Sequence, residues 1–280
     1  MKLIAESGAT KCDWAIIDPF DNSSTIFRTR GINIAVNSEK EIQSVLNDVL
    51  LGLNPLKVEE VWFYGAGIVD PLSCPALYNL LRRTFRNAEK IAMQSDLTAA
   101  AHATFGDRAG IVAIMGTGSN CAMYDGSQVE IKARSGGFIL GDEGSGARLG
   151  KLFLSDFIKG NVPESISAEF QKVHPELDYA GIVRKVYREE APSRFLASLA
   201  KDLYPMIEAG NYPDRLFRRN CEDFFDAFLP HYDTDRYSLG IAGKMASMTE
   251  KYITEAAAAR SIRLEKIIQS PIAELVKYHV

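Results

Sequence analysis

The sequence predicts an α/β fold. Short apolar runs typical of strands, such as residues 61–64 and 238–242, alternate with longer segments that have helical periodicity. The chain of 280 residues is 46% hydrophobic and 24% charged, which suits one large domain or two smaller ones. No low-complexity linker interrupts the alternation, so any domain boundary is expected within a helix or a tight connection.

The first part of the chain begins with a hairpin. A short apolar strand leads into a turn rich in glycine, serine and threonine, and a second apolar strand ends at Asp18-Pro19. The helix expected next has Ile42, Val45, Leu46 and Leu50 on one face. The expected elements are strands over 2–5, 14–17, 25–29, 61–64 and 90–93 and helices over 39–53, 75–86 and 97–105.

A second hairpin follows at residues 111–124. Residues 6–12 (ESGATKC) match residues 115–121 (MGTGSNC) without gaps, with a hydroxyl residue near the end of each turn. This match suggests two domains that begin alike, although two unrelated hairpins would fit equally well. The later elements are helices over 151–158, 179–187, 192–209, 212–228, 246–261 and 272–278 and strands over 238–242 and 264–268.

Composition excludes several classes of protein. The net charge is -4 and no basic block occurs, so nothing favours a nucleic acid or a membrane surface as partner. No apolar run reaches the length of a membrane span, and the first apolar run is too short for a signal peptide. The four cysteines are widely spaced, which disfavours structural zinc and fits reduced thiols in the cytoplasm. The four histidines are dispersed and suggest no metal site.

Two glycine-containing turns are candidate phosphate sites. Backbone N–H groups of Gly116-Thr-Gly-Ser-Asn120 could form an anion-binding nest, with hydroxyls as further donors. The spacing is neither that of a Walker A loop nor G-x-G-x-x-G, and a plain tight turn would look similar. In the first hairpin, Glu6 beside a hydroxyl-rich turn could hold Mg²⁺ through water, or simply lie at a solvated hairpin end.

Carboxylates and an amide elsewhere are candidates for substrate contacts. Asp96 follows a strand and opens a helix, so it could be a general base at the strand's carboxyl end or a helix cap. Asn33 could bind a polyol or belong to a turn. One of Asp142 and Glu143 is a plausible acceptor for a sugar hydroxyl, while the other would cap the following helix or favour its positive end.

The order of the motifs is more specific than any one of them. ESGATK, GIN, QSDLTAA, MGTGSNC, GGFILGDEGSGA and IAGKMA, in that order, resemble the N-acetylglucosamine kinase and BadF/BadG-type ATPase family of the sugar kinase/heat-shock protein 70/actin superfamily. The resemblance runs almost from end to end. It implies two ribonuclease H-like, actin-like ATPase domains with ATP and sugar in a central cleft. The expected domains are 1–106 plus 264–280, and 107–263 with a helical insertion. A homodimer is also implied.

The resemblance assigns roles to individual residues. Asp96 matches the catalytic base, and Glu6 would hold Mg²⁺ through water. The implied activity is ATP-dependent phosphorylation of an amino sugar, with N-acetylglucosamine and its 6-hydroxyl as the expected substrate and acceptor. The positions that match nucleotide contacts are Gly8, Thr10, Lys11, Gly118, Asn120 and Gly243, and those that match sugar contacts are Asn33, Thr117, Gly137 and Asp142.

Several residues depart from the family pattern, and two other functions stay open. The first motif often reads Asp-Gly-Gly-Gly-Thr, but Glu6, Ser7 and Ala9 stand here, and Lys244 replaces a small residue in the adenosine motif. These changes could alter metal or nucleotide use. One alternative is an ATPase activator with an iron–sulfur cluster, for which the cysteines are misplaced. The other is a non-catalytic sugar sensor, which would bind sugar without producing ADP.

Overall fold

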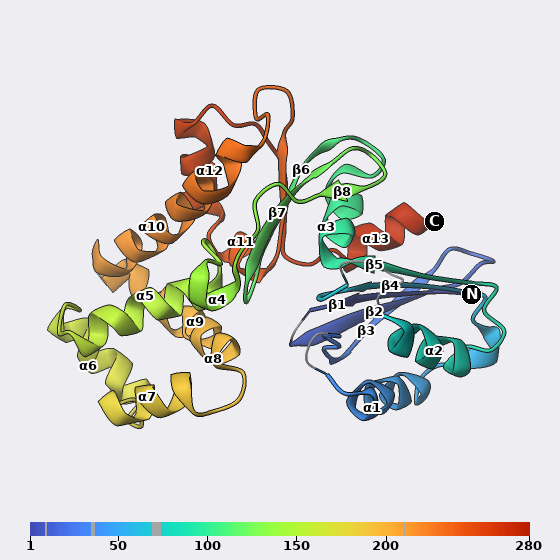
Figure 1. Ribbon diagram of the computed structural model, residues 1–280, viewed down its shortest axis with the longest axis horizontal. Helices are drawn as coiled ribbons and strands as arrows, with labels where there is room; N and C mark the ends of the chain where they lie inside the picture. The colour runs from blue at the N-terminus through green and yellow to red at the C-terminus, as the bar shows by residue number, and fades with distance from the viewer. Residues whose placement is uncertain (9, 35–36, 69–73, 210) are drawn as a thin grey trace. The chain divides into compact units, whose positions relative to one another are not determined.

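The computed structural model describes residues 1–280 except 9, 35–36, 69–73 and 210. It divides into two compact units (Figure 1). The first comprises residues 1–108, 126–129 and 270–280, and the second comprises 109–125 and 130–269. Each contains a five-stranded sheet and its own helices, as the α/β prediction requires. Ala9, one of the departures in the first motif, lies outside the described residues.

The first sheet has the strand order β3-β2-β1-β4-β5. β1 pairs antiparallel with β2 and parallel with β4, so the predicted hairpin forms one half of a mixed sheet. The elements of this unit are β1 (Lys2–Ser7), β2 (Lys11–Ile17), β3 (Ser24–Arg30), α1 (Glu39–Leu50), η1 (Pro55–Lys57), β4 (Glu60–Gly65), α2 (Pro75–Thr84), β5 (Lys90–Ser95), α3 (Asp96–Phe105) and α13 (Ile272–His279).

Helices cover both faces of this sheet. Side chains alternate along β1, so Leu3 and Ala5 pack in the core formed with α1 and α2, whereas Ile4 packs in the core formed with α3 and α13. Figure 1 shows α1 and α2 on one face and α3 and α13 on the other. Helix α1 starts where Ser38 and Glu41 form a capping box.

Helix α13 brings the end of the chain back to the first unit. Its Leu275 is fully buried, and Lys2 Nζ donates to the backbone oxygen of His279 at 2.6 Å. The Tyr64 hydroxyl in β4 lies 2.9 Å from Nδ1 of His102 in α3 and 2.9 Å from Nε2 of His279. One phenol therefore joins β4, α3 and α13.

This histidine pair predicts that the first unit is less stable in acid. Burial lowers the pKa of both His102 and His279 to about 4, against an ordinary value of 6.5. Between those values the unfolded chain binds more protons than the folded chain, so stability is complete above about pH 6.5 and is lost as the pH falls through about 4. We expect the melting temperature to fall by roughly 5 °C more in wild type than in a His102→Asn/His279→Gln variant between pH 7 and pH 4.5.

The double variant is a matched control because the amides of Asn and Gln reproduce the ring nitrogens that bond to Tyr64 yet do not titrate. Thermal melts followed by circular dichroism at several pH values would measure the difference. Parallel pH curves for the two proteins would contradict the prediction.

The second sheet repeats the topology of the first. Its order is β10-β9-β6-β7-β8, and β6 pairs antiparallel with β7 and parallel with β9, as β1 does with β2 and β4. The hairpins differ in register, however, because Ser7 is opposite Cys12 in the first and Met115 is opposite Ser119 in the second. The gapless match of residues 6–12 with 115–121 therefore does not superpose the two turns.

One core holds the second unit together. It joins the sheet to the long amphipathic helix α10, whose Phe217, Phe224 and Phe225 are almost completely buried. The elements are β6 (Gly110–Met115), β7 (Ser119–Tyr124), β8 (Val129–Glu130), α4 (Gly137–Leu140), α5 (Gly146–Ile158), α6 (Glu164–Val173), α7 (Tyr179–Tyr187), α8 (Pro192–Ser198), α9 (Ala200–Leu203), η3 (Tyr204–Ala209), α10 (Asn211–Phe228), η4 (Leu229–His231), β9 (Leu239–Ala242), α11 (Lys244–Met248), α12 (Glu250–Ala259) and β10 (Leu264–Ile268).

Several elements differ from the sequence expectation: the single helix expected over 192–209 is divided into α8, α9 and η3, and α6 was not expected. The helix expected over 246–261 is divided between α11 and α12, which are separated at Thr249, whose hydroxyl donates to the carbonyl of Met245 at 2.7 Å. Residues 264–268 form β10, which pairs with β9 in the second sheet. The chain therefore returns to the first unit at Ser270 and not at residue 264. Within the described residues, no helix is both long and apolar enough to cross a membrane.

Candidate active site

In the first unit, the carboxyl ends of three parallel strands lie level with one another. Ser7 of β1 is in register with Gly65 of β4, and Gly65 is in register with Ser95 of β5. The turn after β1 and Asp96 after β5 therefore share one edge of the sheet. The charge of Asp96 adds to the raised pKa of Glu6.

Asp96 is not the cap of its helix. Ser95 is the N-cap, since its side chain accepts from the Thr98 amide at 3.1 Å. The Asp96 carboxylate accepts from the Leu97 amide at 2.9 Å, and no cation pairs with it within the described part of the chain. Burial raises its pKa to about 6. Ser95, and not Asp96, is therefore the cap of α3. The Asp96 carboxylate lies at the end of β5 and has a raised pKa.

Glu6 lies opposite a second carboxylate, Asp13, in the hairpin. Burial raises the pKa of Glu6 to about 7, with Lys11 opposing the shift and Asp13 and Asp96 adding to it. Burial would also raise the pKa of Asp13, but hydrogen bonds from Arg28 (2.6 Å) and Lys11 (2.5 Å) hold it below its ordinary value.

The ammonium of Lys11, a predicted nucleotide contact, is therefore bound to Asp13 here. Ser270 Oγ, at the return of the chain to this unit, also lies 3.1 Å from the Asp13 carboxylate. Asp13 was not among the candidate residues predicted from the sequence. The available signal was a single acidic residue among the apolar residues 12–17, which is uncommon unless the charge is paired.

The segment containing Asn33 is fastened to both ends of the first turn. The buried Ser7 hydroxyl accepts from the Ile32 amide at 2.7 Å and donates to the Ile32 carbonyl at 3.0 Å. The Gly31 amide donates to the carbonyl of Thr10 at 3.2 Å. Ser7, one of the departures from the family pattern, thus positions Asn33 near the first turn. The turn itself closes by a hydrogen bond from the Gly8 amide to the Lys11 carbonyl, and Thr10 is exposed on it.

In the second unit, the turn between β6 and β7 is fixed to the start of α5. The Gly146 amide donates to the Gly116 carbonyl at 2.9 Å, and the Ala147 amide donates to the Thr117 carbonyl at 3.1 Å. The Ser119 hydroxyl is buried and has no hydrogen-bond partner among the described residues. An unsatisfied buried donor beside a glycine-rich turn fits an anionic ligand.

Asp142 lies against this turn. Its Oδ1 is 3.4 Å from the Ser119 amide, and its Oδ2 would be only 3.0 Å from a Cβ added at Gly118. Burial raises the Asp142 pKa, although the amide of Ser119 and the hydroxyl of Ser135 lower it. Asp142 also has a φ of 58°, a strained conformation for a residue other than glycine.

The two neighbouring carboxylates have different environments. Ser145 is the N-cap of α5, so neither Asp142 nor Glu143 caps that helix. Glu143 instead pairs with Arg148 at 3.5 Å. Asp142 is therefore the better candidate for a ligand contact, and Glu143 takes part in an ion pair.

The remaining candidates in this unit differ in their surroundings. Gly243 has a φ of 130°, and a Cβ there would be 2.2 Å from the Met115 carbonyl oxygen, so Gly243 is pressed against the strand that leads into the Gly116 turn. Gly137 has a φ of 71° and open space where a Cβ would be. Asn120 Oδ1 accepts from the Cys121 amide, and Lys244 is exposed.

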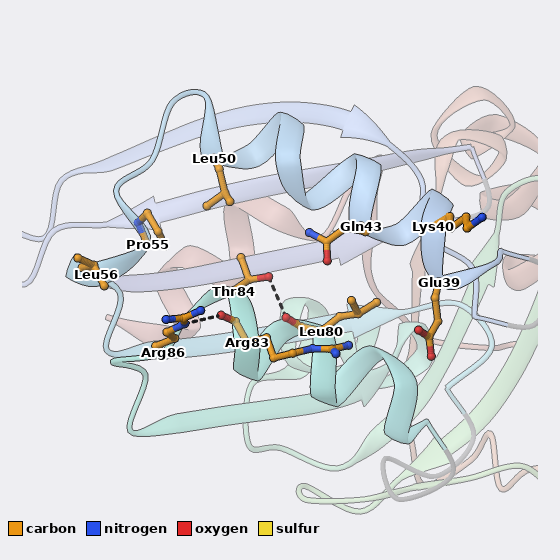
Figure 2. A pocket seen from close by; sticks show the side chains of 10 residues that line it. All are labelled: Glu39, Lys40, Gln43, Leu50, Pro55, Leu56, Leu80, Arg83, Thr84 and Arg86. Atoms are coloured by element: carbon orange, nitrogen blue, oxygen red, sulfur yellow. Dashed lines mark hydrogen bonds between the residues drawn. The ribbon is translucent and has the colours of Figure 1, made fainter.

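A separate groove in the first unit contains none of these candidates. It is an open surface groove of about 690 Å³ between α1, η1 and α2 (Figure 2). Leu50, Leu56 and Leu80 line it together with Arg83 and Arg86. None of its lining residues takes part in the chemistry argued from Asp96.

The fold and the two clusters of residues define a class of protein. The repeated strand order and the glycine-rich turn after the first strand of each sheet are those of an actin-like ATPase fold made of two ribonuclease H-like units. Among solved structures, a candidate N-acetylglucosamine kinase from Porphyromonas gingivalis is 33% identical with a TM-score of 0.93, covering 100% of this chain and 98% of that one. The chain therefore belongs to the N-acetylglucosamine kinase family.

Two further solved structures share the fold at lower sequence identity. A candidate N-acetylglucosamine kinase from Chromobacterium violaceum shares the fold at 14% identity and a TM-score of 0.72, covering 99% and 98% of the two chains. A ROK family glucokinase from Streptomyces griseus, solved with glucose and AMPPNP, shares it at 15% and 0.57, covering 99% and 97%.

One curated relative with a named activity matches part of the chain. The N-acetylmuramic acid/N-acetylglucosamine kinase of Clostridium acetobutylicum is 27% identical over an aligned length of 180 residues, and the match covers 60% of this chain. The match spans only 58% of that relative's length. No protein-family model matches the chain.

Proposed function

We propose that this protein transfers the γ-phosphoryl group of ATP to a hydroxyl of an amino sugar, giving N-acetylglucosamine 6-phosphate from N-acetylglucosamine. The observation that carries the proposal is the Asp96 carboxylate. It lies at the carboxyl end of β5, has a pKa raised to about 6, and is left free of both helix capping and ion pairing in the described structure. This is what a general base in phosphoryl transfer requires.

In the proposed reaction, the sugar hydroxyl oxygen forms a bond to Pγ while the bond from Pγ to the β,γ-bridging oxygen breaks and ADP leaves. The hydroxyl proton passes to the Asp96 carboxylate. Asn33 and Asp142 are proposed to bind sugar hydroxyls. The Gly8–Lys11 and Gly116–Asn120 turns are proposed to hold phosphates through backbone N–H groups and through hydroxyls such as that of Ser119. Catalysis would then rest on positioning and electrostatics.

The residues present fit a magnesium ion. Mg²⁺ usually keeps several waters, and the Glu6 carboxylate near the end of β1 would bind one of these waters. A group of three or more acidic, histidine or cysteine ligands is not found among the described residues, so a water-mediated contact from Glu6 is the form proposed. When bound, the ion would neutralise charge on the phosphates.

A coupled assay of ADP release over a panel of amino sugars tests the proposal. N-Acetylglucosamine, glucosamine, N-acetylmannosamine and N-acetylmuramic acid would be compared at equal concentration with ATP and Mg²⁺. We expect N-acetylglucosamine to give the highest kcat/KM. Sugar binding by calorimetry without any ADP release would instead support a sensor, and iron in the purified protein would support an ATPase activator. Each of the four cysteines is buried in the described structure, which offers no support for the activator.

The raised pKa of Asp96 predicts a pH-dependent rate. A general base works only when deprotonated, so kcat/KM should be level above about pH 7 and fall as the pH drops through about 6. We expect roughly a tenfold fall per pH unit well below that value. Initial rates between pH 5 and pH 8, in buffers of equal ionic strength, would measure it. A rate that stays constant across this range would contradict the assignment of the base.

A further inference from the structure

Asn220 is a completely buried polar residue in the middle of α10. Its side-chain Oδ1 accepts from the backbone amide of Gly144 at 3.2 Å, and its Nδ2 donates to the backbone carbonyl of Ser145 at 3.1 Å. Both ends of one amide thus bind consecutive residues about 75 positions earlier in the chain. Burying an amide is costly unless it is hydrogen-bonded, and here both of its polar atoms are used.

The segment that Asn220 holds could not easily keep its shape without support. Asp142 and Gly144 both have positive φ values, 58° and 82°. A Cβ at Gly144 would be 2.7 Å from Met115 Cε and 2.8 Å from Phe224 Cβ, so this turn is pressed between the end of β6 and α10. Such conformations persist where the surroundings fix them.

A second contact joins the same turn to the same helix. Arg148 pairs with Glu143 in the turn at 3.5 Å and with Asp223 in α10 at 2.9 Å. Asp223 lies three residues after Asn220 and so on the same side of α10. The Arg148 pairs are partly exposed, whereas the Asn220 contacts are fully buried. We expect the Asn220 contacts to matter more, because exposed ion pairs contribute little.

From these contacts we infer that Asn220 is a positioning residue for the sugar-binding carboxylate Asp142. It fixes the turn of residues 142–145 so that the carboxylate is held against Gly118 and the Ser119 amide. Asn220 itself touches no substrate in this role. The inference rests on the proposed function, since it takes Asp142 as a sugar contact.

The test compares Asn220→Ala with Phe217→Leu. Phe217 lies on the same helix and is equally buried, but its ring packs on Tyr204 and Tyr252. Both changes should lower the melting temperature by similar amounts. For Asn220→Ala we expect the KM for the sugar to rise roughly tenfold or more, with the KM for ATP changed less than about twofold. Phe217→Leu should leave both KM values within about twofold.

Hydrogen–deuterium exchange gives a readout that does not depend on activity. Peptides covering residues 141–149 should exchange roughly tenfold faster in Asn220→Ala than in wild type and Phe217→Leu. Unchanged exchange would overturn the inference whether or not the enzyme is active. Faster exchange with an unchanged sugar KM would also overturn it. A wild-type protein that phosphorylates no amino sugar, with faster exchange in Asn220→Ala, would refute the proposed function but leave the support of the turn standing.

Discussion

Replacing Asp96 with asparagine is expected to lower kcat by roughly 10³-fold while sugar binding changes by only a few-fold. The carboxylate lies at the strand end and is the acceptor proposed for the hydroxyl proton, and an amide cannot take that proton. The change is nearly isosteric. Ser95 still caps α3, so the helix should fold normally.

The loss should be measured as ADP release at saturating sugar and ATP, with sugar affinity determined separately by calorimetry. Asp48→Asn is the matched control, because Asp48 is an exposed carboxylate in the same unit, on α1. It should keep the kcat of wild type. Turnover by the Asp96 variant within about tenfold of wild type would remove Asp96 from the role of base.

Replacing Gly243 with alanine is expected to have the second large effect. The Cβ would be 2.2 Å from the Met115 carbonyl oxygen, and a φ of 130° is one that residues other than glycine rarely adopt. Met115 ends β6 and leads into the Gly116 turn. The backbone must therefore shift at this turn. We expect a loss of about 3 kcal/mol or more in stability and a rise of roughly tenfold or more in the KM for ATP.

Gly160→Ala is the control that distinguishes the effect of the contact with Met115 from the effect of a positive φ. Gly160 also lies in the second unit and has a φ of 71°, but nothing is within 4 Å of the added Cβ. This control should cost about 1 kcal/mol and leave the KM for ATP unchanged. Urea unfolding and initial rates would measure both quantities. Equal effects of the two substitutions would show that the contact with Met115 has no influence on the turn.

Local sequence patterns predicted much of this fold because they act over a few residues. Short apolar runs predicted the strands of both hairpins, and the spacing of Ile42, Val45 and Leu46 predicted α1. The boundaries were less certain. β10 was expected in the first domain, but it pairs with β9, and strand pairing between residues 25 positions apart leaves no local signal.

The candidate site was predicted in part for the same reason. A carboxylate after a strand and hydroxyl-rich turns after two others can be found by reading the chain, and the structure places Glu6, the first turn and Asp96 along one edge of a sheet. The sequence does not show which of these residues form caps or ion pairs. Whether Asp96 or Ser95 caps α3, and whether Asp142 or Glu143 faces the Gly116 turn, depends on hydrogen bonds and ion pairs seen only in the folded unit.

The sequence by itself determined the α/β class, the two hairpins, the motif order of the family and the identity of the proposed base. Tertiary structure decided which charges are neutralised and which remain available. Asp13 forms an ion pair with Lys11, and burial raises the pKa of Glu6 and Asp96. Asn220 accepts a hydrogen bond from the Gly144 amide. The physical reason is that periodicity and turn chemistry are set by near neighbours, whereas burial and charge pairing depend on residues that only folding brings together.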